Sequence, residues 1–150
     1  MREIIYAMQF TGRAAPKDAA TPTVLKATTT APSCSLTSTA GPEGIRGSLQ
    51  RVAGAEATFE SEVVFSDAST FQESGTIAFG QNGHRLRFST IGQGYLGPSA
   101  DPTRKHGTVM WKVDEGEGQF AGASGLITSN FFVSDTGEVT DHHFGVIFVR

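Results

Sequence analysis

The chain has 150 residues, the size of one domain, and a chain of this length buries roughly 70% of the surface that it exposes when unfolded. Charged residues make up 18% of it and the formal net charge is −3, which argues against a nucleic-acid-binding surface. The single cysteine, Cys34, excludes a disulfide within the chain. Neither a secretory leader nor a long apolar run is recognised, so we expect a cytoplasmic protein without a membrane partner.

The N-terminal part of the chain predicts two strands separated by a loop. Apolar side chains from Ile4 to Phe10 recur at every second position, which is the period of a strand with one buried face. Residues 12–22 show no periodicity and are predicted to form a loop, and residues 23–30 to form the second strand. Residues 31–42 are irregular, and we expect an edge strand or a long crossing loop there.

The rest of the chain predicts seven more strands. They cover residues 45–52, 57–65, 70–79, 84–91, 107–113, 126–133 and 139–149. The segments between them are rich in Gly, Asp, Asn and Ser, and short turns of this kind join antiparallel neighbours. No window shows the periodicity of an amphipathic helix. The predicted fold class is all-β, a single domain over residues 1–150 that forms a closed eight-stranded antiparallel up-and-down barrel, because closure removes exposed strand edges.

The last two predicted strands are apolar on both faces. In residues 126–133 and 139–149 large apolar side chains occupy odd and even positions alike, so the outer face needs a cover. We prefer a subunit interface as that cover, because no helix is predicted that would lie there, and we expect a homo-oligomer, either a dimer or a trimer. A long N-terminal loop folded over the barrel would serve equally.

The segment Gly116–Gly125, with the sequence Gly-Glu-Gly-Gln-Phe-Ala-Gly-Ala-Ser-Gly, lies between two predicted strands. It resembles a turn of the allene oxide cyclase barrel superfamily, which includes plant allene oxide cyclases, dirigent proteins and small bacterial barrels. Its glycines allow backbone conformations closed to other residues, and Phe120 is expected to plug one barrel end. The resemblance covers roughly Gly75 to Arg150. It implies a calycin-like eight-stranded barrel, frequently oligomeric, whose members cyclise, steer or bind hydrophobic small molecules in an elongated apolar cavity. No catalytic residue is carried over from it.

Glu73 and Asn130 are candidates for catalysis. Glu73 shares the apolar face of its strand with Phe71, and a carboxyl group inside a barrel has a raised pKa and can act as a general acid or base. A bulge at Gly75 would instead turn Glu73 toward water. Asn130 is a candidate to hold an oxyanion or to order a water. In the structural alternative its side-chain amide instead bonds to backbone groups that a β-bulge leaves unpaired.

The adjacent residues His142 and His143 point to opposite faces of their strand, so they cannot chelate one metal together. One of the two is expected to face the cavity, and the pattern leaves open which; we take His142, in phase with Phe144, as the proton-transfer group. A buried histidine bonded to a backbone carbonyl is the alternative. No metal and no cofactor are predicted, because the sequence has neither the ligand spacing of a metal site nor a nucleotide-binding motif.

Five aromatic residues are candidates for contact with a substrate. They are Tyr6, Phe71, Tyr95, Trp111 and Phe144. Trp111 offers a flat surface for stacking, with core filling as the alternative. Tyr95 lies in residues 92–97, which are predicted to form a flexible rim or lid. The other three lie on the predicted inward faces of their strands.

These features favour a cofactor-independent isomerase, cyclase or lyase that acts on a hydrophobic small molecule inside the barrel. Glu73 and His142 would exchange protons, Asn130 would stabilise negative charge, and the aromatic side chains would set the shape of the substrate. A second hypothesis is a non-catalytic barrel that binds a hydrophobic ligand. A third is a structural oligomeric module whose interior is filled by side chains.

Overall fold

The computed structural model describes residues 1–150, which form eleven strands and one short 3₁₀ helix. In chain order these are β1 (Arg2–Pro16), β2 (Val24–Ala31), β3 (Cys34–Gly41), β4 (Gly44–Arg51), β5 (Ala57–Phe65), β6 (Thr70–Phe79), β7 (Arg85–Thr90), β8 (Gly94–Pro98), β9 (Arg104–Glu117), η1 (Gly118–Phe120), β10 (Ser124–Ser134) and β11 (Glu138–Val149). The structure contains no helix with the length and apolar character that a membrane span requires.

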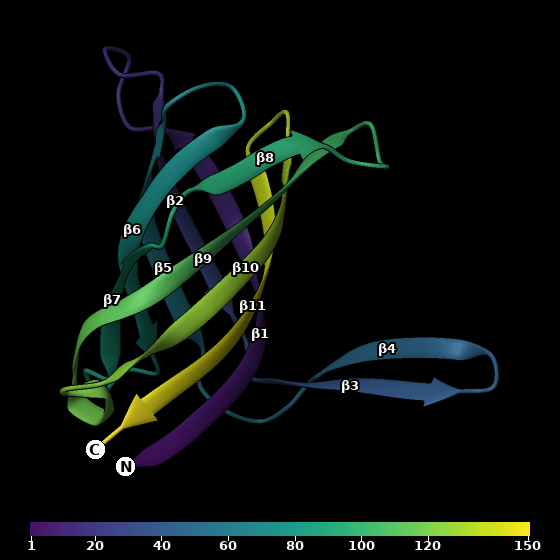
Figure 1. Cartoon of the computed structure of the whole chain (residues 1–150), viewed down its shortest axis with the longest axis vertical. Coiled ribbons are helices and arrows are strands. Elements are labelled where there is room, and N and C mark those ends of the chain that lie inside the picture. The colour runs from purple at the N-terminus through teal and green to yellow at the C-terminus, as the bar shows by residue number, and fades with distance from the viewer.

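Nine of the strands form one sheet that closes on itself as an antiparallel barrel (Figure 1). Their order is β10, β11, β1, β2, β5, β6, β7 and β9, and β9 pairs back with β10. β7 and β8 share one position between β6 and β9, with β7 toward one end of the barrel and β8 toward the other. The barrel therefore has eight strand positions, and the predicted closed eight-stranded antiparallel fold is confirmed.

Most of the predicted strands are found with small differences at their ends. β5 and β6 have the predicted bounds, and β2, β4, β7, β9, β10 and β11 differ from the prediction at one or both ends. β1 buries the predicted face, because Phe10 is fully buried and Tyr6 packs against the core.

Two segments differ from the prediction, and a third settles an open alternative. In residues 12–22, predicted as a loop, β1 continues as far as Pro16, because β2 pairs with it along that stretch. Residues 31–42 hold β3, so the edge strand is found there and not the crossing loop; it pairs with β4 outside the barrel. Residues 92–97, predicted as a flexible rim, hold most of β8, whose backbone pairs with both β6 and β9.

β3 and β4 form a separate two-stranded sheet between β2 and β5 in the chain. This hairpin, residues 34–51, projects from the side of the barrel and is called the arm below (Figure 1). Its base lies against β1, where the Cys34 thiol donates a hydrogen bond to the Ala7 carbonyl at 3.6 Å.

Aromatic rings fill the middle of the barrel and close one of its ends. The centroids of Phe88 and Phe59 are 5.3 Å apart, and those of Phe88 and Trp111 are 4.4 Å apart. At one end Phe120 of η1 is buried against Phe79, with their centroids 5.2 Å apart. The turn that carries Phe120 begins at Gly118, whose φ of +62° is a conformation that glycine adopts without strain.

Candidate functional site

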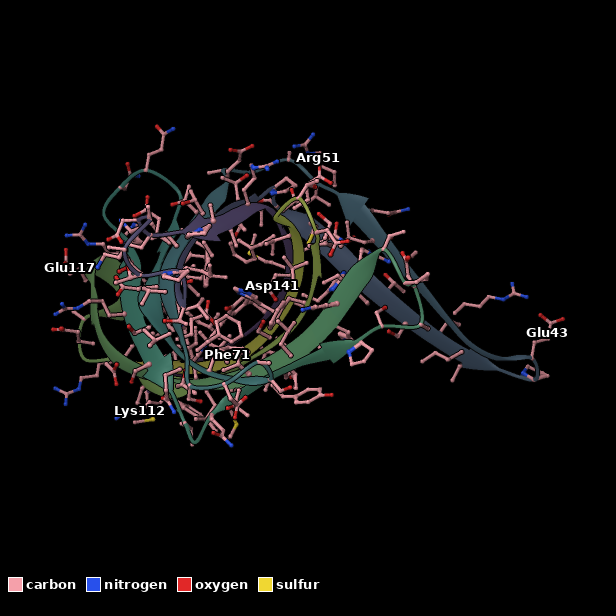
Figure 2. All side chains as sticks on the ribbon, turned by 90° about the horizontal axis from the view of Figure 1, so that it is seen from above. Glu43, Arg51, Phe71, Lys112, Glu117 and Asp141 are labelled. Carbon is pink, nitrogen blue, oxygen red and sulfur yellow. The ribbon has the colours of Figure 1, made fainter.

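A cavity of about 70 Å³ lies inside the barrel, at the end opposite Phe120. Eleven of its fourteen lining residues are apolar, and the three polar ones are Thr29, Glu73 and Asp141. Figure 2 looks down on this end and shows Phe71 and Asp141 within the ring of strands. An apolar interior with a few convergent polar groups is the usual form of a small-molecule site.

Glu73 lies where β6 changes partner from β7 to β8. Pairing with β7 ends at Ser74, and pairing with β8 covers Thr70 and Phe71. Between these two paired stretches, the Thr90 hydroxyl accepts a hydrogen bond from the Glu73 N–H and donates one to the Glu73 carbonyl, each at 2.8 Å. On this side the backbone of Glu73 is thus satisfied by a side chain of β7 and not by strand backbone, while its own side chain turns into the barrel.

The environment of Glu73 favours its neutral form. The residue is 8% exposed, and the Ser61 hydroxyl donates a hydrogen bond to Glu73 Oε1 at 2.6 Å. Burial raises the pKa of Glu73 to about 8; the Ser61 bond lowers this pKa and the charge of Asp141 raises it. The Trp111 indole also lowers it, although its Nε1 makes no hydrogen bond of normal geometry. Most Glu73 side chains therefore carry a proton at pH 7.

Both oxygens of Asp141 take part in hydrogen bonds inside the barrel. The Ser129 hydroxyl donates a hydrogen bond to Asp141 Oδ1 at 2.6 Å, and His143 Nε2 lies 2.9 Å from Asp141 Oδ2. Because a carboxylate only accepts hydrogen bonds, His143 Nε2 carries the hydrogen in this contact. Ser129 and His143 thus fix the Asp141 side chain in one orientation at the cavity.

His143 is fixed by aromatic rings on several sides. Its ring stacks on Phe10 with centroids 4.3 Å apart, and it meets Phe59 and Trp111 edge to face at 5.3 and 5.1 Å. His143 is 2% exposed and does not line the cavity. It therefore positions Asp141 and does not itself meet a molecule in the cavity.

Four buried polar atoms have no hydrogen-bond partner within the protein. They are Tyr6 Oη, Thr29 Oγ1, Trp111 Nε1 and His143 Nδ1. Buried polar groups are normally bonded, so an unpaired one that borders a cavity is suited to a polar atom of a bound molecule. Thr29 is the one of the four that lines the cavity. Burial and, to a smaller extent, the charge of Asp141 raise the pKa of Tyr6, so its phenol stays protonated.

The cavity therefore combines a protonated carboxyl group, a second carboxyl group held by two hydrogen bonds, and an unpaired hydroxyl. Glu73, Asp141 and Thr29 supply them on β6, β11 and β2, with apolar side chains around them. Two carboxyl groups in one apolar site are an arrangement able to support acid and base chemistry.

Five of the predicted site residues lie inside the barrel or at its rim. Glu73 and Phe71 face the interior and line the cavity, as the strand pattern predicts. Trp111 is fully buried in the core but does not line the cavity. Tyr6 is also interior, but it packs toward the closed end of the barrel. Tyr95 lies on β8, is half exposed and is not part of the cavity lining.

The predicted inward placement of His142, Asn130 and Phe144 is wrong. All three lie on the outer face of the barrel, and Phe144 is 51% exposed. β10 and β11 are apolar on both faces, so a period of two does not tell the inner face from the outer one. The inward positions are the alternate ones, which include Ser129 on β10 and His143 on β11.

Sequence reasoning missed Asp141, Ser129 and Thr29 as site residues. Gly145 indicates which face of β11 points into the barrel, because it lies directly opposite Tyr6 on β1. A Cβ atom at Gly145 would lie 2.1 Å from the Tyr6 ring, so only glycine leaves room for this inward aromatic side chain. The face of β11 that contains Gly145 is therefore the inner face.

The structure holds no group of three or more His, Cys, Asp or Glu side chains arranged to bind a metal ion. Comparisons with protein-family models, curated proteins and solved structures found no match for this chain. Its function is therefore argued from the chemistry of the cavity in a closed β-barrel.

Proposed function

We propose that this protein is a cofactor-independent enzyme that moves protons on a small hydrophobic molecule, as an isomerase, cyclase or lyase does. The observation that carries the proposal is the sharing of one apolar cavity by Glu73 and Asp141. Burial keeps Glu73 mostly protonated at neutral pH, and Asp141 is held by the Ser129 hydroxyl and the His143 ring. A barrel interior excludes water, which strengthens both groups as an acid and a base.

The proposed first step is the enolisation of a bound carbonyl compound. Glu73 donates its proton to the carbonyl oxygen, and Asp141 removes a proton from the carbon beside the carbonyl. An O–H bond forms and a C–H bond breaks, which leaves an enol, an ionised Glu73 and a protonated Asp141. In a β,γ-unsaturated carbonyl compound this enol is a dienol. Transfer of the proton from Asp141 to the γ-carbon, with return of the oxygen's proton to Glu73, then gives the α,β-unsaturated isomer and restores both groups.

The surroundings of the two carboxyl groups support these roles. Ser61 donates to Oε1 of Glu73, and Ser129 and His143 contact the two oxygens of Asp141. Each carboxyl oxygen has two lone pairs, so these bonds hold both groups in place and leave sites for proton exchange. The unpaired hydroxyl of Thr29 is available to a polar group of the substrate.

The cavity volume limits what is held beside these groups. A space of about 70 Å³ is smaller than the cavity of about 150 Å³ that holds benzene in an engineered protein. The proposed substrate therefore places a short chain or part of a small ring beside Glu73 and Asp141, and a larger molecule would extend toward the open end. The resemblance of Gly116–Gly125 to the allene oxide cyclase superfamily supports the same substrate class.

Deuterium exchange tests the proposal. Butanone and cyclopentanone are incubated with the protein in D₂O, and the loss of the proton signals beside the carbonyl is followed by NMR. We expect exchange faster than in buffer, and a decrease of this catalysed rate by roughly 10²- to 10⁴-fold in Glu73→Gln and in Asp141→Asn. His142→Ala, on the outer face, is the matched control and should exchange at the wild-type rate.

A non-catalytic barrel that binds a hydrophobic ligand is the second candidate, and the eleven apolar residues of the cavity lining favour it. The single tryptophan, Trp111, packs on Phe59, which lines the cavity, so its fluorescence reports occupancy. Saturable quenching by the same ketones without catalysed exchange would favour this second candidate. The absence of both quenching and exchange would argue against both functions and favour the structural module.

A further inference from the structure

The arm has one apolar face and one polar face. Residues that pair across the two strands share a face, and Leu36 pairs with Leu49 while Ala40 pairs with Ile45. The other face is polar and carries Ser35, Thr37, Thr39, Arg46, Ser48 and Gln50. On the apolar face Leu36 is 56% exposed and Ile45 is 75% exposed. The pattern is that of a hairpin with one side meant for burial.

The barrel of the same chain does not cover this apolar face. Beyond Cys34 every residue of β3 and β4 is exposed, and the arm extends away from the barrel to its tip at Glu43 (Figures 1 and 2). An isolated two-stranded hairpin is at best marginally stable in water. A stable arm therefore requires packing against something outside its own barrel.

The barrel has an uncovered apolar surface on the strands next to the arm. One row across β1, β11 and β10 consists of Ile5, Val146 and Leu126. A second row continues from β1 to β9 and consists of Ala7, Phe144, Thr128 and Met110. The exposed fractions of Ile5, Leu126 and Phe144 are 61%, 48% and 51%. We call these two rows the apolar face of the barrel.

The other side of the barrel is built differently. There the outer face of β7 pairs with that of β9 through the ion pairs Arg85–Glu117 and Arg87–Glu115. The two rows of the apolar face contain no charged residue, and the first row ends where Leu126 pairs with Lys112 on β9. Single exposed apolar side chains occur elsewhere, as at Val64 on β5, but on this side they form two adjacent rows, which is typical of an interface.

The two apolar surfaces of the chain meet at β1. Cys34 pairs with Arg51 at the base of the arm and belongs to the same face as Leu36. Its thiol donates to the carbonyl of Ala7, which is part of the second row on the barrel. Each chain therefore presents an apolar arm surface and an apolar barrel surface that are continuous with each other.

We propose that the arm packs its apolar face on the apolar face of the barrel of a second copy of this chain, in a two-fold dimer with reciprocal arms. Each eight-residue strand of the arm spans about 27 Å, and the four strands of the receiving face span about 14 Å between the axes of the outer two, so the arm is long enough to cross it. Each copy supplies one arm and one receiving face, so a two-fold arrangement satisfies both and closes. This explains in one contact why both surfaces lack a cover within the chain.

Charge insertion on either surface tests the dimer by native mass spectrometry and light scattering. We expect a dimer for the wild-type protein, and a rise of its dissociation constant by about tenfold or more in Ile45→Lys and in Leu126→Lys. Thr37→Lys on the polar face of the arm, and Val64→Lys on the outer face of β5, are matched controls that should remain dimeric. Unchanged Trp111 fluorescence in all four variants would show that the barrel stays folded.

Disulfide trapping tests which surfaces meet. In a Cys34→Ser background, one chain carries Ile45→Cys and the other Leu126→Cys, and the two are mixed and oxidised. We expect a covalent dimer from this mixture and none from a mixture of Thr37→Cys with Leu126→Cys. A monomeric wild-type protein would overturn the proposal. A dimer that tolerates both lysine substitutions and gives no specific disulfide would overturn it as well.

Discussion

Glu73 couples the stability of the protein to pH. Its pKa is about 8 in the folded chain, against an ordinary value of 4.5. Between these two pH values the folded state keeps a proton that the unfolded chain has lost, so the free energy of unfolding falls as pH rises, by up to about 1.4 kcal/mol per pH unit. We expect Glu73→Gln to remove this slope. Urea denaturation from pH 5 to 8, followed by Trp111 fluorescence, measures it, and parallel curves for the two proteins would contradict the assignment.

The two adjacent histidines should respond very differently to the same substitution. His143→Ala removes a donor to the buried Asp141 and leaves a cavity among three aromatic rings, which should cost about 3 to 4 kcal/mol. His142→Ala removes an exposed side chain that bonds only to Gln9, and should cost about 0.5 kcal/mol or less. Urea denaturation of both variants at one pH measures the two losses in the free energy of unfolding. Equal losses would contradict the placement of His143 inside the barrel and of His142 outside it.

Whether the sequence predicted correctly which side chains point into the barrel depended on how clearly each strand alternates apolar and polar residues. β6 alternates apolar and polar residues, so the inward direction of Glu73 could be predicted from its phase with Phe71. β11 has Phe144 and Phe148 on one face and Ile147 and Val149 on the other, so the phase of its polar residues was ambiguous. The partners of Glu73 and Asp141 come from other strands, and their identity depends on register, which a single sequence does not contain.

At the scale of elements, β8 is held close against the interior by a glycine. A Cβ atom at Gly94 would lie 2.2 Å from the Phe71 ring. Gly94→Ala must therefore push Phe71 toward the cavity and should destabilise the protein by about 1 to 3 kcal/mol. Gly41→Ala at the tip of the arm is the control, because its Cβ meets nothing within 4 Å and the change should cost less than about 0.5 kcal/mol. Thermal unfolding of the two variants compares them, and a stable Gly94→Ala protein would contradict this packing.

The strand that the sequence did not predict is β8. Residues 92–97 contain three glycines, which normally break strands, yet β8 is a strand because β6 and β9 bind its backbone on both sides. Tertiary pairing outweighs local propensity there. For β3 the sequence left an edge strand and a loop open, because its small and polar residues alternate weakly, and the pairing with β4 decides for the strand.

At the scale of the whole molecule, the barrel is closed at one end and hollow at the other. Phe120 and Phe79 fill the closed end, whereas the other end keeps an apolar space beside Glu73 and Asp141. Side chains fill the interior of a purely structural barrel of this size, and space of this kind lowers stability. The cavity is therefore a feature that stability alone would not favour, and it is the part of the barrel on which the proposed function depends.

Filling this cavity should separate stability from function. Ala27 lines the cavity from β2 and is 8% exposed, so Ala27→Leu adds apolar volume where space exists. We expect the variant to be more stable by about 0.5 to 2 kcal/mol, and to lose both ketone exchange and ligand-induced quenching of Trp111. Ala15→Leu, at an exposed position on β1, should change neither property. Urea denaturation and NMR exchange on the same samples give both readouts. A more stable variant that keeps full exchange would place the chemistry outside this cavity, whereas a destabilised one would show that the space is already needed by the core.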